Sequence, residues 1–556
     1  VCILAREFVN VRGEQSKFFG PEEGRREADI FHKSIITDEA LARMAERAPA
    51  EMLELQAGYI AGYNRFLTDH PGEKLPASCR GQAWVRPIDA ADIRRMTIGV
   101  GIRYGVGRAQ SAIANAAPPN VEVKTSSETL QSDPLPADET LFGSNAVALG
   151  KLATVNGRGM LLGNPHYPWS GPSRFHMAHL TIPGELDLMG VGLFTTQFVS
   201  IGFNHDVAWT HTVSTALRYT LYELELDPSD PQRYRYGSET RELKPRSVTI
   251  DVRGADGKLA TESHTVYDSH VGPVVEDKDL SWTRERAYAI RDSNLNNNRG
   301  IEQYFKFGRA KSVEELLSAM QTSQGVAWVN TIAADRHGKA LYADLSVVPN
   351  VDEALIKRCS SSKVQRWREA PTVVLRATPE CEWRNDPRAQ QTGILPPQQL
   401  PSLIREDYVT NSNDSYWLSN PQQPLEGFSP IIGAERTARS LRTRAGLVLV
   451  DEVLRGEDRN KFDAARLQEM LFNHRNYGAE LALDEVLAIC ARESNTVVLK
   501  DATFDVAPAC KALGAWDRRQ DVESRGAQVW TEFWPLAEKT PNFWRVAFDP
   551  KDPVHT

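Results

Sequence analysis

Long apolar runs are missing from this chain, and positive charge is outnumbered by negative charge. No stretch approaches the ~18 consecutive apolar residues of a membrane-spanning helix. Lysine and arginine total 65 against 73 aspartates and glutamates, a formal net charge of −8. That balance provides no basic field to hold a nucleic-acid backbone. We therefore expect no membrane span and no nucleic-acid partner. With 41% hydrophobic and 25% charged residues, the 556-residue chain has the composition of a folded globular protein.

Common catalytic signatures are absent as well. The sequence contains no G-x-S-x-G nucleophile elbow, Walker loop, H-E-x-x-H zinc motif or EF-hand loop. Two glycine-rich stretches, 99–105 and 157–163, have the wrong last spacing for a dinucleotide-binding loop. These absences argue against the α/β-hydrolase, nucleotide-binding and zinc-protease classes.

Cysteine is scarce, and its six residues form no C-x-x-C pair, which argues against a metal cluster or a dithiol redox site. Two pairs are separated by about twenty residues, a distance that suits loop closure. The alternative is six buried thiols in a reducing compartment. We expect disulfides, and hence an exported and oxidising setting, with the pairing Cys2–Cys79, Cys359–Cys381 and Cys490–Cys510.

The chain divides into three parts. Residues 1–116 predict a helical unit, because apolar residues recur there with helical spacing. Residues 117–143 are rich in Pro, Ser, Thr, Asp and Glu and lack periodicity, which is typical of a linker. This segment is either a surface loop or a piece excised during maturation. Residues 144–556 begin with many short strands and return to helix at 434–517, so an α+β fold is favoured over a doubly wound parallel sheet.

The expected strands are short apolar stretches bounded by Gly, Pro and Asn. They lie at 145–148, 160–162, 177–182, 186–191, 198–203, 207–212, 219–226, 247–252, 327–333, 340–347 and 408–410. A hairpin turn is expected at Asp256–Gly257.

Histidines gather between His166 and His211. Within this stretch, His176 and His179 have a spacing that a metal site on a helix could use. The segment has the pattern of a strand, however, and in a strand side chains three positions apart, such as these two, point to opposite faces. We therefore expect no metal at this pair.

The most informative stretch is Leu141-Phe-Gly-Ser-Asn-Ala-Val147, where the linker meets the first strand. Gly143 tolerates conformations that strain the next peptide bond, and Ser144 can attack its preceding carbonyl in an N→O acyl shift. Cleavage would leave Ser144 with a free α-amine, which titrates near ~8. Such an amine can act as the general base for its own hydroxyl. A Gly–Ser pair before a strand is common, so the pair alone does not establish this chemistry.

The surrounding motifs resemble the penicillin acylase family of N-terminal nucleophile hydrolases. They include Gly143-Ser-Asn-Ala146, Gly159-Met-Leu-Leu-Gly-Asn-Pro-His166, His179-Leu-Thr-Ile-Pro-Gly184, Ala208-Trp-Thr-His-Thr-Val213, Trp328-Val-Asn330 and Asn411-Ser-Asn-Asp-Ser-Tyr-Trp417. The resemblance covers nearly the whole chain, and within the family it is strongest to the acyl-homoserine-lactone and aculeacin acylases.

The resemblance implies a four-layer αββα fold and cleavage of one precursor into an α/β heterodimer. It also implies export to the periplasm or medium and a reaction without a cofactor. The helical α-chain would be residues 1–116, and the β-chain would be 144–556. Family members start earlier and continue further, so we expect part of the β-chain to be missing after residue 556.

Catalytic roles also follow from the resemblance. Asn411 competes with Asn413 for one role, the side-chain donor of the oxyanion hole. The other assignments are the nucleophile and α-amine base Ser144, the amine-orienting His166, the backbone oxyanion donor Val213, and an arginine near the site, Arg436.

The family's acyl pocket maps onto an apolar set of residues, each of which could instead be ordinary core. Two of them carry hydroxyls where close relatives often have Phe and Trp, which implies a more polar or shorter pocket. Calcium-binding relatives have carboxylates just after the Val213 position, whereas residues 214–218 contain none, so we expect no calcium site. The pocket residues are Tyr167, Phe175, Leu193, Tyr304, Trp328 and Val329.

These observations predict a cofactor-free amidohydrolase that acts on a small N-acyl amide. The favoured substrate is an N-acyl-homoserine lactone, with β-lactam or lipopeptide deacylation as the alternative. A non-catalytic binding protein with the same fold is the alternative from a different class.

Overall fold

The computed structural model describes residues 1–22, 24–46, 48–119, 143–361, 366–367, 370–456, 460–492, 496–499 and 502–556. Most of the expected linker, 120–142, lies outside these ranges. Helices and several separate sheets occur together, so the expected α+β class is confirmed. Within the described ranges, no helix combines the length and apolarity needed to cross a membrane.

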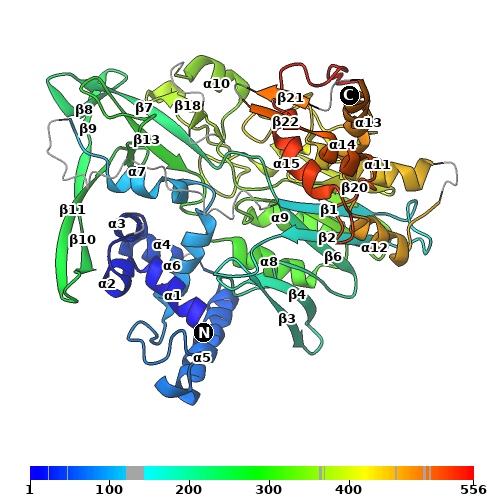
Figure 1. The fold of residues 1–556 in the computed structure, drawn as a ribbon. Coiled ribbons are helices and arrows are strands. Elements are labelled where there is room, and N and C mark those ends of the chain that lie inside the picture. The colour runs from blue at the N-terminus through cyan, green and yellow to red at the C-terminus, as the bar shows by residue number, and fades with distance from the viewer. Residues whose placement is uncertain are drawn as a thin grey trace.

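The N-terminal region is helical, as predicted, and forms the blue part of Figure 1. Its long helical stretch after residue 90 is interrupted, because the chain bends at Gly105 to approach β13 (Arg286–Asp292). A Cβ on Gly105 would lie 1.8 Å from an Asp292 carboxylate oxygen, and that oxygen accepts the Val106 N–H at 2.6 Å. The helices are α1 (Cys2–Val11), α2 (Gln15–Phe19), α3 (Arg25–Ile35), α4 (Asp38–Glu46), α5 (Ala50–Asp69), α6 (Ala90–Gly101) and α7 (Gln110–Ala114).

Two sheets at the centre of the molecule position the site. In the described chain, the smaller has the strand order β2–β1–β20 and the larger has the order β19–β15–β14–β6–β5–β4–β3. Strands β1 and β2 pack on β6 and β14 of the larger sheet. Their bounds are β1 (Gly143–Leu149), β2 (Met160–His166), β3 (Phe175–Ile182), β4 (Leu186–Leu193), β5 (Ile201–Phe203), β6 (Val207–Val213), β14 (Val329–Asp335), β15 (Ala340–Ala343), β19 (Ser402–Arg405) and β20 (Tyr408–Asn411).

Helices lie against both central sheets. Helices α8 (Gly300–Arg309) and α9 (Val313–Ser323) contact β4, β14 and β15 of the larger sheet. The sequence analysis did not predict this pair, which interrupts the run of strands. Helix α11 (Leu441–Arg455) contacts β20 of the smaller sheet, where Leu447 and Val450 join a buried cluster with Val147 and Leu149 of β1.

A third sheet and a long hairpin extend beside the N-terminal helices (Figure 1). The expected hairpin at Asp256–Gly257 is confirmed: it joins β10 to β11, and Gly257 has a φ of 77°. The sheet consists of β12 (Val274–Val275), β13, β7 (Tyr219–Asp227), β8 (Asp230–Tyr236) and β9 (Glu239–Glu242), with β18 (Val374–Arg376) parallel to β7; the hairpin is β10 (Lys244–Arg253) with β11 (Leu259–Asp268).

The C-terminal part is helical, as expected, with one unexpected hairpin, β21–β22. All three predicted disulfides, Cys2–Cys79, Cys359–Cys381 and Cys490–Cys510, are present. The remaining elements are α10 (Glu353–Cys359), α12 (Ala464–Phe472), α13 (Tyr477–Arg492), α14 (Ala507–Gly514), α15 (Ala527–Ala537), β16 (Arg366–Trp367), β17 (Ala370–Pro371), β21 (Thr496–Leu499) and β22 (Ala502–Asp505).

Candidate active site

Ser144 is the second residue of β1 and is buried, with 2% of its surface exposed. Its hydroxyl donates to the Gly143 carbonyl oxygen at 2.6 Å, and its N–H donates to Asn413 Oδ1 at 2.5 Å. The serine oxygen therefore lies beside the carbonyl group that an N→O acyl shift must attack.

His166 ends β2 directly opposite Gly143 in the β1–β2 register. Its Nε2 lies 2.8 Å from Asn164 Oδ1, which can only accept a hydrogen bond, so the ring hydrogen is on Nε2. The unprotonated Nδ1 faces Gly143, since a Cβ there would lie only 3.0 Å from it. Burial, and then the Arg442 guanidinium, lower the pKa of His166, so the ring is neutral at physiological pH.

Two asparagines lie at the end of β20, Asn411 as its last residue and Asn413 two residues later, and they have different partners. Asn411 is internally satisfied: its Oδ1 accepts from Thr212 Oγ1 at 2.6 Å, and its Nδ2 donates to the Asp414 carbonyl at 2.9 Å. Asn413 instead contacts Ser144 and donates through Nδ2 to the Val213 carbonyl at 3.0 Å. Its φ of 61° is a left-handed conformation that asparagine tolerates. The structure thus brings Asn413, rather than Asn411, to the serine.

Val213 ends β6 opposite Val329 of β14. The next N–H, that of Ser214, donates to the Trp328 carbonyl at 3.2 Å, which makes Val213 and Val329 a non-hydrogen-bonded pair. Both the N–H and the C=O of Val213 therefore point away from β14. Because the C=O meets Asn413 Nδ2, the Val213 N–H lies on the same side of the strand as that amide.

The arginine at the site is one that the sequence analysis missed. Arg442 lies in the first turn of α11 and donates to the Ser144 carbonyl at 2.6 Å, Asn145 Oδ1 at 2.9 Å and Asn413 Oδ1 at 3.0 Å. The predicted Arg436 does not join this cluster. Its guanidinium pairs with Glu426 at 2.6 Å, and 66% of its side chain is exposed.

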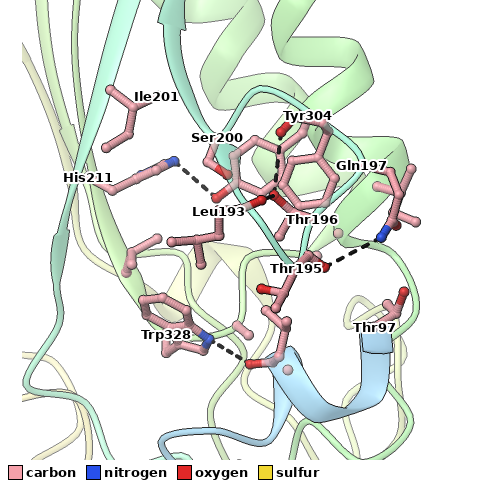
Figure 2. A pocket seen from close by; sticks show the side chains of 18 of the residues that line it. Thr97, Leu193, Thr195, Thr196, Gln197, Ser200, Ile201, His211, Tyr304 and Trp328 are labelled. Atoms are coloured by element: carbon pink, nitrogen blue, oxygen red, sulfur yellow. Dashed lines mark hydrogen bonds between the residues drawn. The ribbon is translucent and has the colours of Figure 1, made fainter. Parts of the chain in front are cut away.

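Ser144 lines an apolar cavity. Figure 2 shows part of the cavity wall, with Leu193, Tyr304 and Trp328 around it. Its wall includes Ser144 and Val213 together with every residue predicted for the acyl pocket: Tyr167, Phe175, Leu193, Tyr304, Trp328 and Val329. Contributions come from β3, β4, β6, β14, α6 and α8, so the cavity lies where the helical region meets the larger sheet.

Tyrosine hydroxyls in the cavity wall have partners within the protein. Tyr104 and Tyr167 are joined at 3.2 Å through their hydroxyls. His211 Nδ1 lies 3.0 Å from the Asn330 carbonyl and must donate to it, so Nε2 accepts from the Tyr304 hydroxyl at 3.0 Å. Burial lowers the pKa of His211 to about 4, which keeps this ring neutral.

The paired histidines of β3 do not form one site. His176 packs on Phe194, whereas His179 lies 2.6 Å from the Asp187 carboxylate on the exposed surface. The strand alternation therefore separates them, as the sequence pattern predicts.

Comparison with known proteins identifies the class of protein. A family model described as penicillin amidase matches residues 1–550, and the chain belongs to that family. The protein is therefore a hydrolase of amide bonds.

Two curated relatives cover the whole chain. The acyl-homoserine lactone acylase PvdQ of Pseudomonas fluorescens strain Pf0-1 is 39% identical over 569 residues, which span 71% of that protein. The aculeacin-A acylase of Actinoplanes utahensis is 39% identical over 578 residues, spanning 72% of it. A solved thermostable penicillin G acylase from Alcaligenes faecalis has a TM-score of 0.48 and 18% identity, covering 68% of this chain and 60% of that one.

Proposed function

We propose that this protein removes the acyl chain from N-acyl-homoserine lactones through an acyl-enzyme on Ser144, after its own chain is cut before that residue. The proposal rests on the position of Ser144, which lies in the wall of an apolar cavity and beside His166, Asn413 and Arg442. Loss of the acyl group would inactivate the lactone as a quorum signal.

The first step is maturation. Ser144 Oγ attacks the Gly143 carbonyl carbon, the hydroxyl proton passes to the Gly143–Ser144 amide nitrogen as that nitrogen leaves, and an ester forms between Gly143 and the serine oxygen. Water then hydrolyses the ester and releases the Gly143 carboxylate. Ser144 becomes the first residue of the β-chain, 144–556, with a free α-amine and a free hydroxyl. The α-chain, 1–116, and the β-chain stay together as a heterodimer, and residues 117–143 are the connecting or excised segment.

The α-amine then serves as the base. Its ordinary pKa near ~8 is already close to neutrality, and the Arg442 guanidinium, bonded to the carbonyl of the same residue, favours the uncharged form. His166 presents the lone pair of Nδ1 toward this position and holds the amine in place. One residue thus supplies both the attacking oxygen and the proton acceptor.

Acylation follows. Ser144 Oγ attacks the acyl carbonyl carbon while the α-amine takes the hydroxyl proton. The oxyanion is stabilised by the Val213 N–H and by Asn413 Nδ2, which has two hydrogens and uses one on the Val213 carbonyl. Collapse breaks the C–N bond, and the α-amine returns its proton to the leaving homoserine lactone nitrogen. Water, deprotonated by the same amine, hydrolyses the ester and releases the fatty acid.

The fold and the setting are part of the proposal. A four-layer αββα arrangement is supported by three sets of contacts. Helix α11 contacts β20 of the smaller sheet, β1 and β2 of that sheet contact β6 of the larger sheet, and α8 and α9 contact β4, β14 and β15 of the larger sheet. Three disulfides favour an oxidising compartment, so we propose a periplasmic or secreted enzyme.

The second candidate is lipopeptide or β-lactam deacylation. The relative named aculeacin-A acylase is as similar to this chain as the one named acyl-homoserine lactone acylase, at 39% identity each. One methylene in an apolar pocket changes binding by only ~1–3 kcal/mol, so one pocket can accept several acyl groups.

The test has two parts. Intact-mass measurement of the purified protein is expected to give two chains with the break before Ser144, and a single chain for Ser144→Ala. The cut protein is then incubated with homoserine lactones of increasing acyl length, an acylated lipopeptide and penicillin G, and the released amine is quantified. Highest kcat/KM on the lactones supports the proposal. An uncut, inactive wild-type chain would favour the binding-protein alternative.

A further inference from the structure

A buried arginine outside the reacting cluster ties together the two strand ends that form one side of the site. Arg218 follows β6 by five residues and is 6% exposed. Its Nη2 donates to the Ser214 carbonyl and to the Trp328 carbonyl, each at 3.0 Å, and its Nη1 donates to the Ala216 carbonyl. The guanidinium therefore bridges the end of β6 and the start of β14.

Ser214, the residue after Val213, is hydrogen-bonded through both its backbone and its side chain. The Ser214 N–H donates to the Trp328 carbonyl at 3.2 Å, and the Ser214 hydroxyl donates to buried Asp344 at 2.5 Å. With Arg218 on its carbonyl, every polar group of Ser214 has a partner within the protein. The Val213–Ser214 peptide plane is thus fixed at its N–H by Trp328 and at its C=O by Asn413.

Burying the charged guanidinium of Arg218 at this turn costs free energy. Removing an ion from water costs several kcal/mol even after relaxation, and Arg218 Nε has no hydrogen-bond partner in the described structure. Burial accordingly lowers the pKa of Arg218 to about 10. A guanidinium can donate to several carbonyls in a fixed planar geometry, which an apolar side chain cannot do.

We infer that Arg218 is a positioning residue for the reaction: by tying the end of β6 to the start of β14 it holds Val213 in place, so that the Val213 N–H is aimed at the developing oxyanion. The inference rests on the proposed function. Because Arg218 acts through backbone that forms the oxyanion hole, its loss should weaken binding of the transition state more than binding of the free fatty acid.

The experiment compares the mature wild-type enzyme with Arg218→Met and Arg218→Lys. Arg444→Met is the matched control, since Arg444 is also a buried arginine that donates to a carbonyl, that of Val554, away from the site. Each variant is checked by intact mass and thermal unfolding. Then kcat, KM, inhibition by an alkylboronic acid and inhibition by the fatty acid of equal length are measured. The boronic acid forms a tetrahedral anion on the serine and reports on the oxyanion hole.

For Arg218→Met we expect kcat and boronate affinity to fall together by about 10- to 100-fold, with fatty-acid affinity within about threefold. Arg218→Lys should lie between this variant and wild type, and it provides the same comparison if Arg218→Met does not fold. Arg444→Met should lose thermal stability only. Equal loss of boronate and fatty-acid affinity in the folded Arg218 variants, or no loss of either, would overturn the inference. A wild type that neither turns over the lactones nor binds the boronate would instead refute the proposed function.

Discussion

Removing the Asn413 side chain is the perturbation whose outcome follows most directly from the contacts at Ser144. The residue has a φ of 61°, so replacement by alanine would add backbone strain of about 1–2 kcal/mol to the loss of the amide. Glycine adopts this conformation freely, and Asn413→Gly therefore isolates the side-chain effect. Asn413→Asp keeps the size and the Oδ1 acceptor but replaces the Nδ2 donor with a carboxylate oxygen.

The expected magnitude comes from the single donor that is lost. One oxyanion-hole hydrogen bond is typically worth about 10²- to 10³-fold in kcat. We expect a loss of that size for Asn413→Gly and a larger one for Asn413→Asp, because a carboxylate repels the oxyanion. KM should change little, since Asn413 does not line the apolar cavity.

The assay is amine release from a homoserine lactone, normalised to the cut fraction determined by mass, because the same residues contact the maturation bond. Asn420→Gly is the control. Asn420 is fully buried and donates to the carbonyl of Tyr408 in β20, away from Ser144. It should lose stability while kcat stays near wild type. Retention of kcat within a few-fold in cut Asn413→Gly would refute the oxyanion-hole assignment.

Three further predictions concern charge, pH and covalent links. Arg442→Met should raise the pKa of the acid limb of the kcat/KM profile, because it removes a positive charge beside the α-amine. Arg442→Lys should raise this pKa less, because the charge is only displaced. An unchanged pH profile would contradict this. Burial lowers the pKa of His32 and His211 to about 4. The stability that each neutral ring contributes is therefore complete above pH ~6.5 and is lost as the pH falls toward 4. The loss in the free energy of unfolding is about 3 kcal/mol for each histidine. Urea unfolding of His32→Gln should accordingly depend less on pH over this interval, and a slope equal to wild type would count against it. Removing the Cys2–Cys79 disulfide, with a sequence separation of 77, should lower the free energy of unfolding by about 4.5 kcal/mol. Removing Cys490–Cys510, with a separation of 20, should lower it by about 3.3 kcal/mol. Denaturant unfolding of variants with both cysteines of a pair replaced by Ser measures these losses, and the reverse order would argue against loop-closure entropy as their source.

Local patterns predicted the central strands well, because short apolar stretches between Gly, Pro and Asn define them. The same patterns missed α8 and α9, whose residues were not separated from the surrounding strand signals. Within the helical unit expected over 1–116, α6 and α7 are separate helices because Gly105 between them must approach the Asp292 carboxylate, a tertiary contact without a local signal. The hairpin β21–β22 was likewise hidden within a region of helical composition.

At the site, motif resemblance pointed to residues at the ends of neighbouring strands, such as Ser144 and His166, which the β1–β2 pairing brings together. It failed for the arginine. Four arginines fall between positions 436 and 444, so spacing alone could not select among them. One local signal was available: Ser440 caps the N-terminus of α11 by accepting the Thr443 N–H, which fixes Arg442 in the first turn of that helix. Arg218 had no signal, since its role depends on carbonyls that are brought together only by the pairing of β6 with β14.

Whether Ser144 acts as an N-terminal nucleophile is tested by identifying the atom that becomes acylated. The cut protein is mixed with an activated acyl ester, quenched in acid and mapped by tandem mass spectrometry. We expect one acyl group on the peptide whose first residue is Ser144, removable by hydroxylamine because it is an oxygen ester, and absent after Ser144→Ala. An acyl group on any other residue, or a peptide in which Gly143 still precedes the modified serine, would contradict it.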